Sequence, residues 1–130
     1  MSDQDGSVRA AVQNVIGAYA QALDAGRWDE IAELFCPDGV AEFVGMARFE
    51  GREALRAGLA GFAPSRPQLH LVANTVVTAV AGDEATAVSD LAFLQRGKSG
   101  WTVQMVGRYE DTLRIHEGAW RFQSRVATFI

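Results

Sequence analysis

The second half of the chain consists of four long segments with the composition of β-strands, joined by short turns. Each segment is rich in β-branched and aromatic residues and is bounded by turn-forming residues. These segments are residues 68–81, 84–96, 101–115 and 119–129. The dipeptide Gly82-Asp83 is a strong hairpin signal, the sequence GKSG forms a loop at 97–100, and His116-Glu117-Gly118 forms another tight turn. Strands that follow one another through such turns pair antiparallel, so we expect a meander.

Helical patterns occupy the first half. A stripe of apolar residues predicts a helix over residues 7–25 that ends at Gly26. The stripe consists of Val8, Val12, Val15, Tyr19 and Leu23. A short helix is expected over WDEIAELF (28–35), stopped by CPDG (36–39), and a third over residues 51–61. The segment AEFVGM (41–46) predicts a short strand. Helices followed by a meander indicate an α+β fold, with the helices on one face of a curved sheet.

The 130 residues, 48% of them hydrophobic and 22% charged, suit one globular domain spanning 1–130. We expect the polar start, residues 1–6, to form a disordered tail. The net charge of −4 and the absence of a basic cluster argue against nucleic acid as a partner. No apolar segment has the length of a membrane span, and the start of the chain has no apolar core of signal-peptide length. Cys36 is the single cysteine. These features predict a cytoplasmic protein that binds no membrane.

The segment QLHLVANTVV (68–77) carries polar groups on a strand that is otherwise largely apolar. Simple alternation places His70, Val72, Asn74 and Val76 on one face. Read alone, His70 is either a core histidine that bonds to backbone or to Asn74, or a base with one ring nitrogen free. Asn74 suits equally a bond to a neighbouring backbone group or a contact to a substrate oxygen.

Other polar residues allow two interpretations as well. Asp24 lies in the last turn of the first helix, where a solvated aspartate costs little. On the strand 101–115, Tyr109 and Asp111 share an apolar face with Trp101 and Met105, and they can hydrogen-bond across the sheet. Arg125 has the parity of solvated neighbours, so it faces inward only if a bulge turns it.

Sequence signatures of other site types are absent. The sequence contains no CxxC, HExxH, GxGxxG, phosphate-binding GxxxxGK[ST] or GxSxG. Two histidines are too few for a usual zinc site. We therefore expect chemistry without a cofactor or a metal.

Several stretches occur together in an order that resembles the SnoaL-like branch of the nuclear transport factor 2-like superfamily. They are YAQALDAGRWDEIAELFCPDG, LHLVANTVV, GDEATA, GRYEDTL and GAWRF. The resemblance covers about residues 8–129. It implies a cone-shaped α+β barrel, in which a strongly curved, mixed but mostly antiparallel sheet wraps around the helices and a deep apolar pocket opens at one end.

The resemblance also assigns roles. Asp24 and His70 match the catalytic aspartate and histidine of scytalone dehydratase and of hexachlorocyclohexane dehydrochlorinase. Asn74 and Arg125 match pocket residues of the dehydrochlorinase, which would require Arg125 to face inward. The sequence also departs from relatives: Leu94 and Gln95 replace a second pocket histidine of scytalone dehydratase.

The ketosteroid isomerases of the superfamily provide a further comparison. Tyr19 and Asp111 match an isomerase tyrosine and its oxyanion-hole acid, but Phe43 stands where the isomerase has its aspartate base. This departure argues against steroid isomerisation by that mechanism.

The resulting hypothesis is an acid–base lyase, dehydratase, isomerase or cyclase that acts on a small hydrophobic molecule through an Asp24–His70 dyad. In this hypothesis the polar groups hold a substrate oxygen or a leaving anion, and apolar side chains form the wall. The polar groups are Tyr19, Asn74, Tyr109 and Arg125, and the wall residues are Phe43, Met46, Trp101 and Met105.

The alternative is a ligand-binding or oligomer-forming subunit without catalysis, such as the small subunit of a ring-hydroxylating dioxygenase. In either case Leu69, Leu71 and Val77 form an apolar outer face, which predicts a homodimer through the sheets, with a trimer as the second possibility.

Overall fold

The computed structural model describes residues 3–130 and contains three helices and six strands within them. In chain order these are α1 (Asp3–Ala25), α2 (Trp28–Glu33), β1 (Phe35–Phe43), β2 (Ala47–Glu50), α3 (Arg52–Ala60), β3 (Gln68–Ala81), β4 (Glu84–Gly97), β5 (Gly100–His116) and β6 (Ala119–Phe129). The strands form one sheet in the order β2-β1-β6-β5-β4-β3. All neighbours pair antiparallel except β1 and β6, which are parallel. The mixed, mostly antiparallel sheet that we expected is confirmed.

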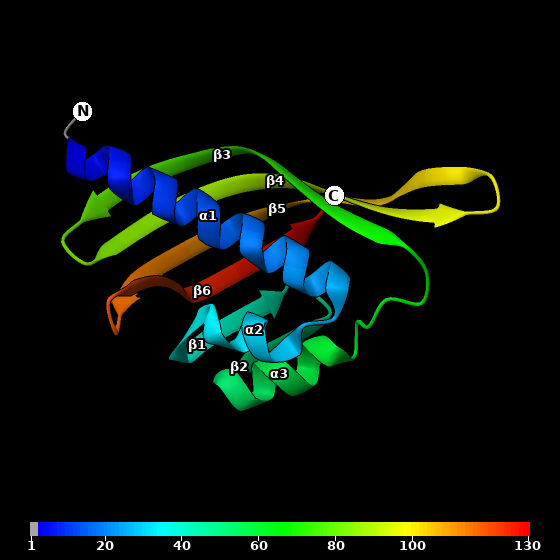
Figure 1. Cartoon of the computed structure of the whole chain (residues 1–130), viewed down its shortest axis with the longest axis horizontal. Coiled ribbons are helices and arrows are strands. Elements are labelled where there is room, and N and C mark those ends of the chain that lie inside the picture. Colours follow the sequence, from blue (N-terminus) through cyan, green and yellow to red (C-terminus); the bar gives the residue numbers. More distant parts are fainter. Residues whose placement is uncertain (1–2) are drawn as a thin grey trace.

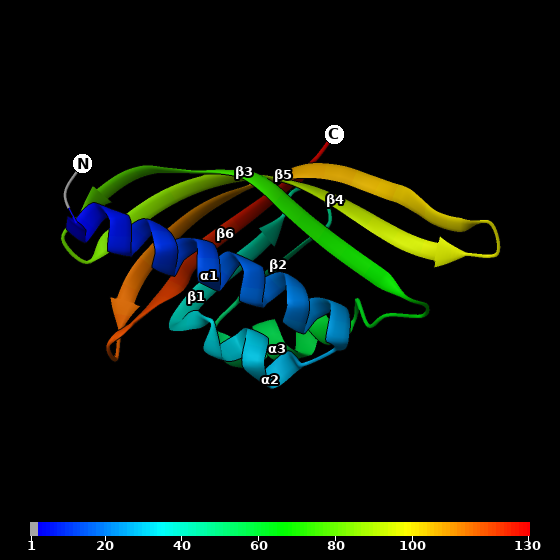
Figure 2. The same ribbon diagram turned by 45° about the horizontal axis from the view of Figure 1, so that its top comes forward.

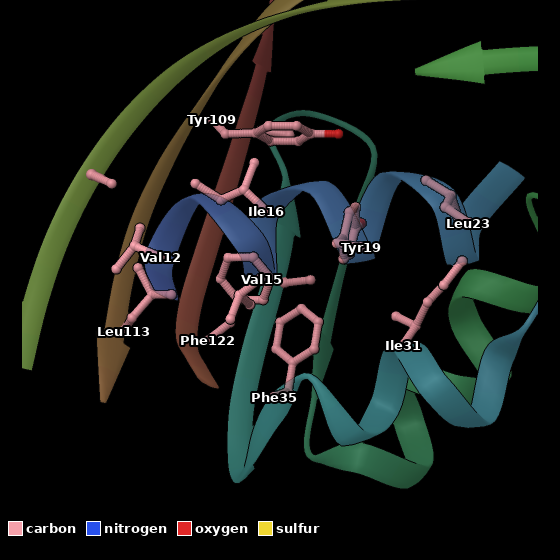
Figure 3. Close-up of a cluster of buried hydrophobic side chains, with 14 of the residues drawn as sticks. Val12, Val15, Ile16, Tyr19, Leu23, Ile31, Phe35, Tyr109, Leu113 and Phe122 are labelled. Carbon is pink, nitrogen blue, oxygen red and sulfur yellow. The ribbon is translucent and has the colours of Figure 1, made fainter. Parts of the chain in front are cut away.

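The helices cover one face of the curved sheet, which does not close into a barrel (Figures 1 and 2). α1 lies across this face and packs on β3, while α2 and α3 pack together beside β1. The stripe predicted for α1 is buried, and it meets Phe35, Leu113 and Phe122 from three strands (Figure 3). The α+β class is therefore confirmed, and its core lies between α1 and the sheet.

The start of α1 differs from the prediction. The helix begins at Asp3, so residues 3–6 belong to it instead of to a tail, while residues 1–2 lie outside the described residues. No proline interrupts this segment, and each residue added to an existing helix gains one backbone hydrogen bond. The helix therefore extends toward the N-terminus beyond its apolar stripe.

The region after α2 also differs. α2 ends at Glu33, and the CPDG segment lies within β1 instead of forming a turn. Pro37 is tolerated there because the pairing of β1 with β6 is irregular between Phe35 and Val40, so no ladder donor is needed. The strand predicted at 41–46 ends at Phe43, and a turn leads into β2, which the sequence did not reveal.

Four β-bulges change which face the strand residues occupy. On β3 the register shifts between Ala73 and Val76 and again between Val77 and Ala79. On β5 it shifts at Gln104, and on β6 it shifts at Gln123. An extra residue on one strand reverses the inward and outward assignment of everything beyond it. These bulges decide the orientation of several candidate residues.

Candidate active site

A pocket of about 240 Å³ opens between the end of α1 and the sheet. Its walls are mainly apolar and aromatic, and they come from α1, the segment after α3 and all strands except β2. The lining residues are Leu23, Phe43, Met46, Phe62, Ala63, Gln68, His70, Leu91, Phe93, Gln95, Met105, Tyr109 and Phe129. No lysine or arginine is among them. A wall of this kind favours a small, neutral, hydrophobic ligand.

His70 lines this pocket, and Asp24 contacts it from behind the lining. Asp24 Oδ1 lies 2.6 Å from His70 Nδ1, and the two side chains are only 12% and 14% exposed. Because a carboxylate only accepts hydrogen bonds, Nδ1 carries the proton in this contact. No side chain that the structure describes forms a hydrogen bond with Nε2. This nitrogen is therefore available to a ligand in the pocket that His70 lines.

Local structure explains how Asp24 reaches this position. Gly26 adopts a positive φ of 70° and ends α1, with Arg27 N donating to Ala22 O in a C-terminal cap. A carboxylate near a helix C-terminus costs about 0.3–1 kcal/mol. Asp24 offsets this cost by accepting three N–H bonds, since hydrogen bonds to a charged group contribute about 1.5–3 kcal/mol each.

The other two donors to Asp24 also come from β3. His70 N donates to Oδ2 at 2.8 Å, and Gln68 Nε2 donates to Oδ1 at 3.1 Å. The imidazole itself packs against the Phe93 ring, with 4.6 Å between ring centroids. Aromatic packing on one side and the carboxylate on another fix the orientation of the ring.

Two further polar side chains reach the pocket. Gln95 Oε1 accepts from Arg66 Nε and Nη2, so the amide N–H₂ of Gln95 is left to face a ligand. Tyr109 lines the pocket beside the core. Burial raises the pKa of the Tyr109 hydroxyl, with Arg125 opposing and Asp111 and Asp24 adding to the rise. Tyr109 therefore stays protonated near neutral pH and can donate a hydrogen bond.

Four of the residues expected to bind substrate line the pocket: Phe43, Met46, Met105 and Tyr109. Trp101 does not, because the bulge at Gln104 turns it to the outer face, where it is 45% exposed. Asn74 does not either. It adopts a positive φ of 54° in the β3 bulge and donates to Asp90 on the exposed face. The inward faces predicted for Trp101 and Asn74 were wrong because simple alternation does not persist through a bulge.

Arg125 faces inward, as the resemblance required, because Gln123 is the extra residue of the β6 bulge. It does not line the pocket. Its Nε donates to Asp111 Oδ1 at 2.9 Å, and its Cζ lies 3.5 Å from the ring centroid of Tyr109. Burial lowers the pKa of Arg125, but Asp111 and the tyrosines raise it by more, so the guanidinium stays charged.

Tyr19 is also in the core instead of in the pocket. It is 1% exposed, packs edge-to-face on Tyr109, and lies against the guanidinium of Arg125. Its hydroxyl has no hydrogen-bond partner among the described residues. Burial raises the pKa of Tyr19 strongly, so it remains a neutral core residue.

Sequence reasoning missed Gln68 as a site residue, and it noted Gln95 only as a departure from a relative. One signal was present: Gln68 shares strand parity with His70, so alternation alone places both on the same face. Among residues 6–130, whose side chains the structure describes, no three His, Cys, Asp or Glu residues gather into a possible metal site. In the same part of the chain, no helix is long and apolar enough to cross a membrane.

Comparison with models of protein families identifies the family of this chain. The model of the SnoaL-like domain matches residues 5–126. The chain is a member of the SnoaL-like family. A comparison with curated proteins gives no significant match.

Solved structures share the fold. An aspartate-to-asparagine variant of Rv3472, a Mycobacterium tuberculosis protein of unknown function, is 26% identical with a TM-score of 0.91, over 98% of this chain and 75% of that one. A Novosphingobium aromaticivorans protein assigned as a scytalone dehydratase is 24% identical with a TM-score of 0.88, over 100% and 89%. The β subunit assigned to an aromatic-ring-hydroxylating dioxygenase of the same organism is 20% identical with a TM-score of 0.83, over 98% and 92%. At these identities, the last two show the fold alone.

Proposed function

We propose that this SnoaL-like protein is an acid–base enzyme without a cofactor, which abstracts a proton from a small, neutral, hydrophobic substrate. The observation that carries this proposal is the 2.6 Å contact between Asp24 and His70 at the wall of an apolar pocket. Asp24 holds the Nδ1–H tautomer and stabilises the imidazolium that forms, while Nε2 takes the proton.

The rest of the pocket suits a proton abstraction next to an oxygen-bearing carbon. His70 Nε2 removes a proton from the substrate, and the electron pair moves into a new double bond or onto a carbonyl oxygen. The hydroxyl of Tyr109 and the free amide N–H₂ of Gln95 are available to donate to that oxygen. Expulsion of a β-substituent with its bonding electron pair completes an elimination, whereas return of the proton to another carbon completes an isomerisation. In a cyclisation, the carbanion attacks a second carbonyl carbon of the same substrate, and the oxygen of that carbonyl takes up the proton from His70.

The size of the pocket limits the substrate. An apolar cavity of about 150 Å³ holds one benzene ring, so 240 Å³ suits a molecule of one or two rings. The absence of lysine and arginine from the lining favours a neutral molecule, because a buried anion there would lack a counter-charge. Small aromatic, terpenoid and polyketide compounds are therefore the first to screen, by thermal shift and then by turnover.

The test uses Asp24→Asn and His70→Ala against His116→Ala, which removes the other histidine, at the end of β5 and outside the pocket lining. We expect losses of about 10²–10⁴-fold in kcat for the first two variants and wild-type turnover for the third. Full activity in both dyad variants would sink the proposal.

The second candidate is a binding or assembly subunit, and one observation favours it. The outer face of the sheet carries exposed apolar side chains on β3 and β5: Leu69, Leu71, Val76, Trp101, Val103 and Val106. Val77, which we placed on this face, is buried inward by the β3 bulge, and Val76 takes its place.

Exposed apolar residues on one sheet face favour association with a second copy. We propose a homodimer through this face, and a trimer is the other outcome to distinguish. Val103→Asp places a charge in the patch and should yield monomers by sedimentation, with the Asp24–His70 pocket intact. A monomeric wild-type protein would contradict the homodimer.

A further inference from the structure

Gln68 contacts the carboxylate of the dyad from the same strand as His70. Its Nε2 donates to Asp24 Oδ1 at 3.1 Å, and the residue is 9% exposed at the pocket wall. Since a carboxylate can only accept, the amide nitrogen must face Asp24, and this assignment follows from chemistry alone.

The two oxygens of Asp24 are held separately. The main-chain N–H of His70 binds Oδ2, and Gln68 binds Oδ1, the same oxygen that contacts the imidazole. Two donors on different oxygens define the plane of a carboxylate. Oδ1 is therefore presented to the His70 ring independently of the ring itself. Without Gln68, the main-chain bond would be the only one that holds the carboxylate apart from the contact to the ring itself, so carboxylate and ring could turn together.

We propose that Gln68 is a positioning residue: its carboxamide fixes the plane of the Asp24 carboxylate, which holds His70 in the Nδ1–H tautomer with Nε2 free for the pocket. The catalytic meaning of this role rests on the proposed function, while the effect on the tautomer exists in the ligand-free protein.

Gln95 provides a matched control. It is the direct cross-strand partner of Gln68, has the same side chain and lines the same pocket, but it binds Arg66 instead of Asp24. If the loss of an amide acted only by weakening the polar wall of the pocket, substitutions of Gln68 and Gln95 would change the tautomer of His70 alike. If it acts through Asp24, only the substitution of Gln68 changes the tautomer.

The experiment compares Gln68→Met and Gln95→Met, because Met is unbranched like Gln but lacks the amide. Ring ¹⁵N NMR of neutral His70 reports the tautomer. We expect a single Nδ1–H tautomer in the wild type and in Gln95→Met. In Gln68→Met we expect a mixture that includes the Nε2–H form. With a substrate in hand, Gln68→Met should lower kcat by about 10–100-fold, with KM little changed.

An unchanged Nδ1–H tautomer in Gln68→Met would overturn the proposal. If that variant does not fold, Gln68→Asn answers the same question, because its amide is one methylene too short to reach Asp24. The tautomer is measured without turnover, so the two proposals fail separately. A changed tautomer in a protein whose dyad variants keep full activity would retain the positioning role and reject the proposed function.

Discussion

The Asp24–His70 pair and the Asp111–Arg125 pair each join a carboxylate to a nitrogen base, at 2.6 Å and 2.9 Å. Their surroundings differ. The first pair is 12–14% exposed at the pocket wall, whereas the side chains of the second are 0–1% exposed in the core. One base keeps a ring nitrogen that a ligand can reach, and the other is enclosed by aromatic rings.

Burial and pairing therefore do not suffice for a catalytic site. Arg125 is held between Asp111 and the faces of Tyr19, Tyr109 and Phe122, and it stays charged. His70 can exchange a proton and faces a cavity. Access and a proton that can move distinguish the candidate site from the structural pair.

The largest expected effect concerns the enclosed pair. Asp111→Asn removes the counter-charge of Arg125, and breaking a buried pair from one side typically costs about 3–5 kcal/mol. We expect this loss in the free energy of unfolding measured with urea. The double variant Asp111→Leu with Arg125→Met removes both charges and should recover most of it. A loss of only about 1 kcal/mol in Asp111→Asn would contradict this prediction. One ordinary hydrogen bond contributes about that much, so the buried charge of Arg125 would then need no partner.

The same change at the pocket should cost less stability. Asp24→Asn keeps one oxygen that can accept from β3 but loses at least one charge-assisted bond, and His70 stays partly exposed, so we expect a loss of about 1.5–3 kcal/mol. The effect on turnover, by contrast, is the large one. Equal losses of stability in Asp24→Asn and Asp111→Asn would erase the distinction between the two pairs.

Tyr19 is the opposite case, a buried polar group that is not paired. Its hydroxyl is buried without a partner among the described residues, so Tyr19→Phe removes an unsatisfied polar group. We expect the variant to be as stable as the wild type or more stable by about 1 kcal/mol, as thermal unfolding would reveal. A clear destabilisation would mean that the hydroxyl makes a contact, for example to an internal water beside Arg125.

The smallest effect lies on the exposed face. Asn74 holds a positive φ, so Asn74→Ala should be about 0.5 kcal/mol less stable than Asn74→Gly, equally at all pH values.

Asn74 and then Arg108 lower the pKa of Asp90 by hydrogen bonding. The stability from that contact is therefore present above about pH 4, the pKa of an unfolded aspartate, and is lost as pH falls through the lower folded value. Urea unfolding of wild type and Asn74→Gly at neutral and acid pH tests the sign.

Several features were predictable from the sequence alone. The bounds of β3 and β6 match their predicted segments, and β4 and β5 differ by one or two residues, because long alternating segments and short turns are local signals. The apolar stripe of α1 was predictable for the same reason, since residues three and four apart in the sequence share one face of a helix. Asp24 and His70 followed from the resemblance to relatives. Their contact depends on α1 crossing β3, which the structure provides.

Tertiary structure alone decided which side of each strand several residues occupy. Arg125 is in the core and Trp101 is on the outer face because of bulges at Gln123 and Gln104, and the Asn74 bulge has the same effect on β3. A bulge arises where the curvature of the sheet around α1 requires an extra residue, and no local motif marks it here. The parallel pairing of β1 with β6 and the three donors on Asp24 likewise depend on segments far apart in the chain. Sequence periodicity therefore determined the elements, and long-range packing determined which side chains reach the pocket.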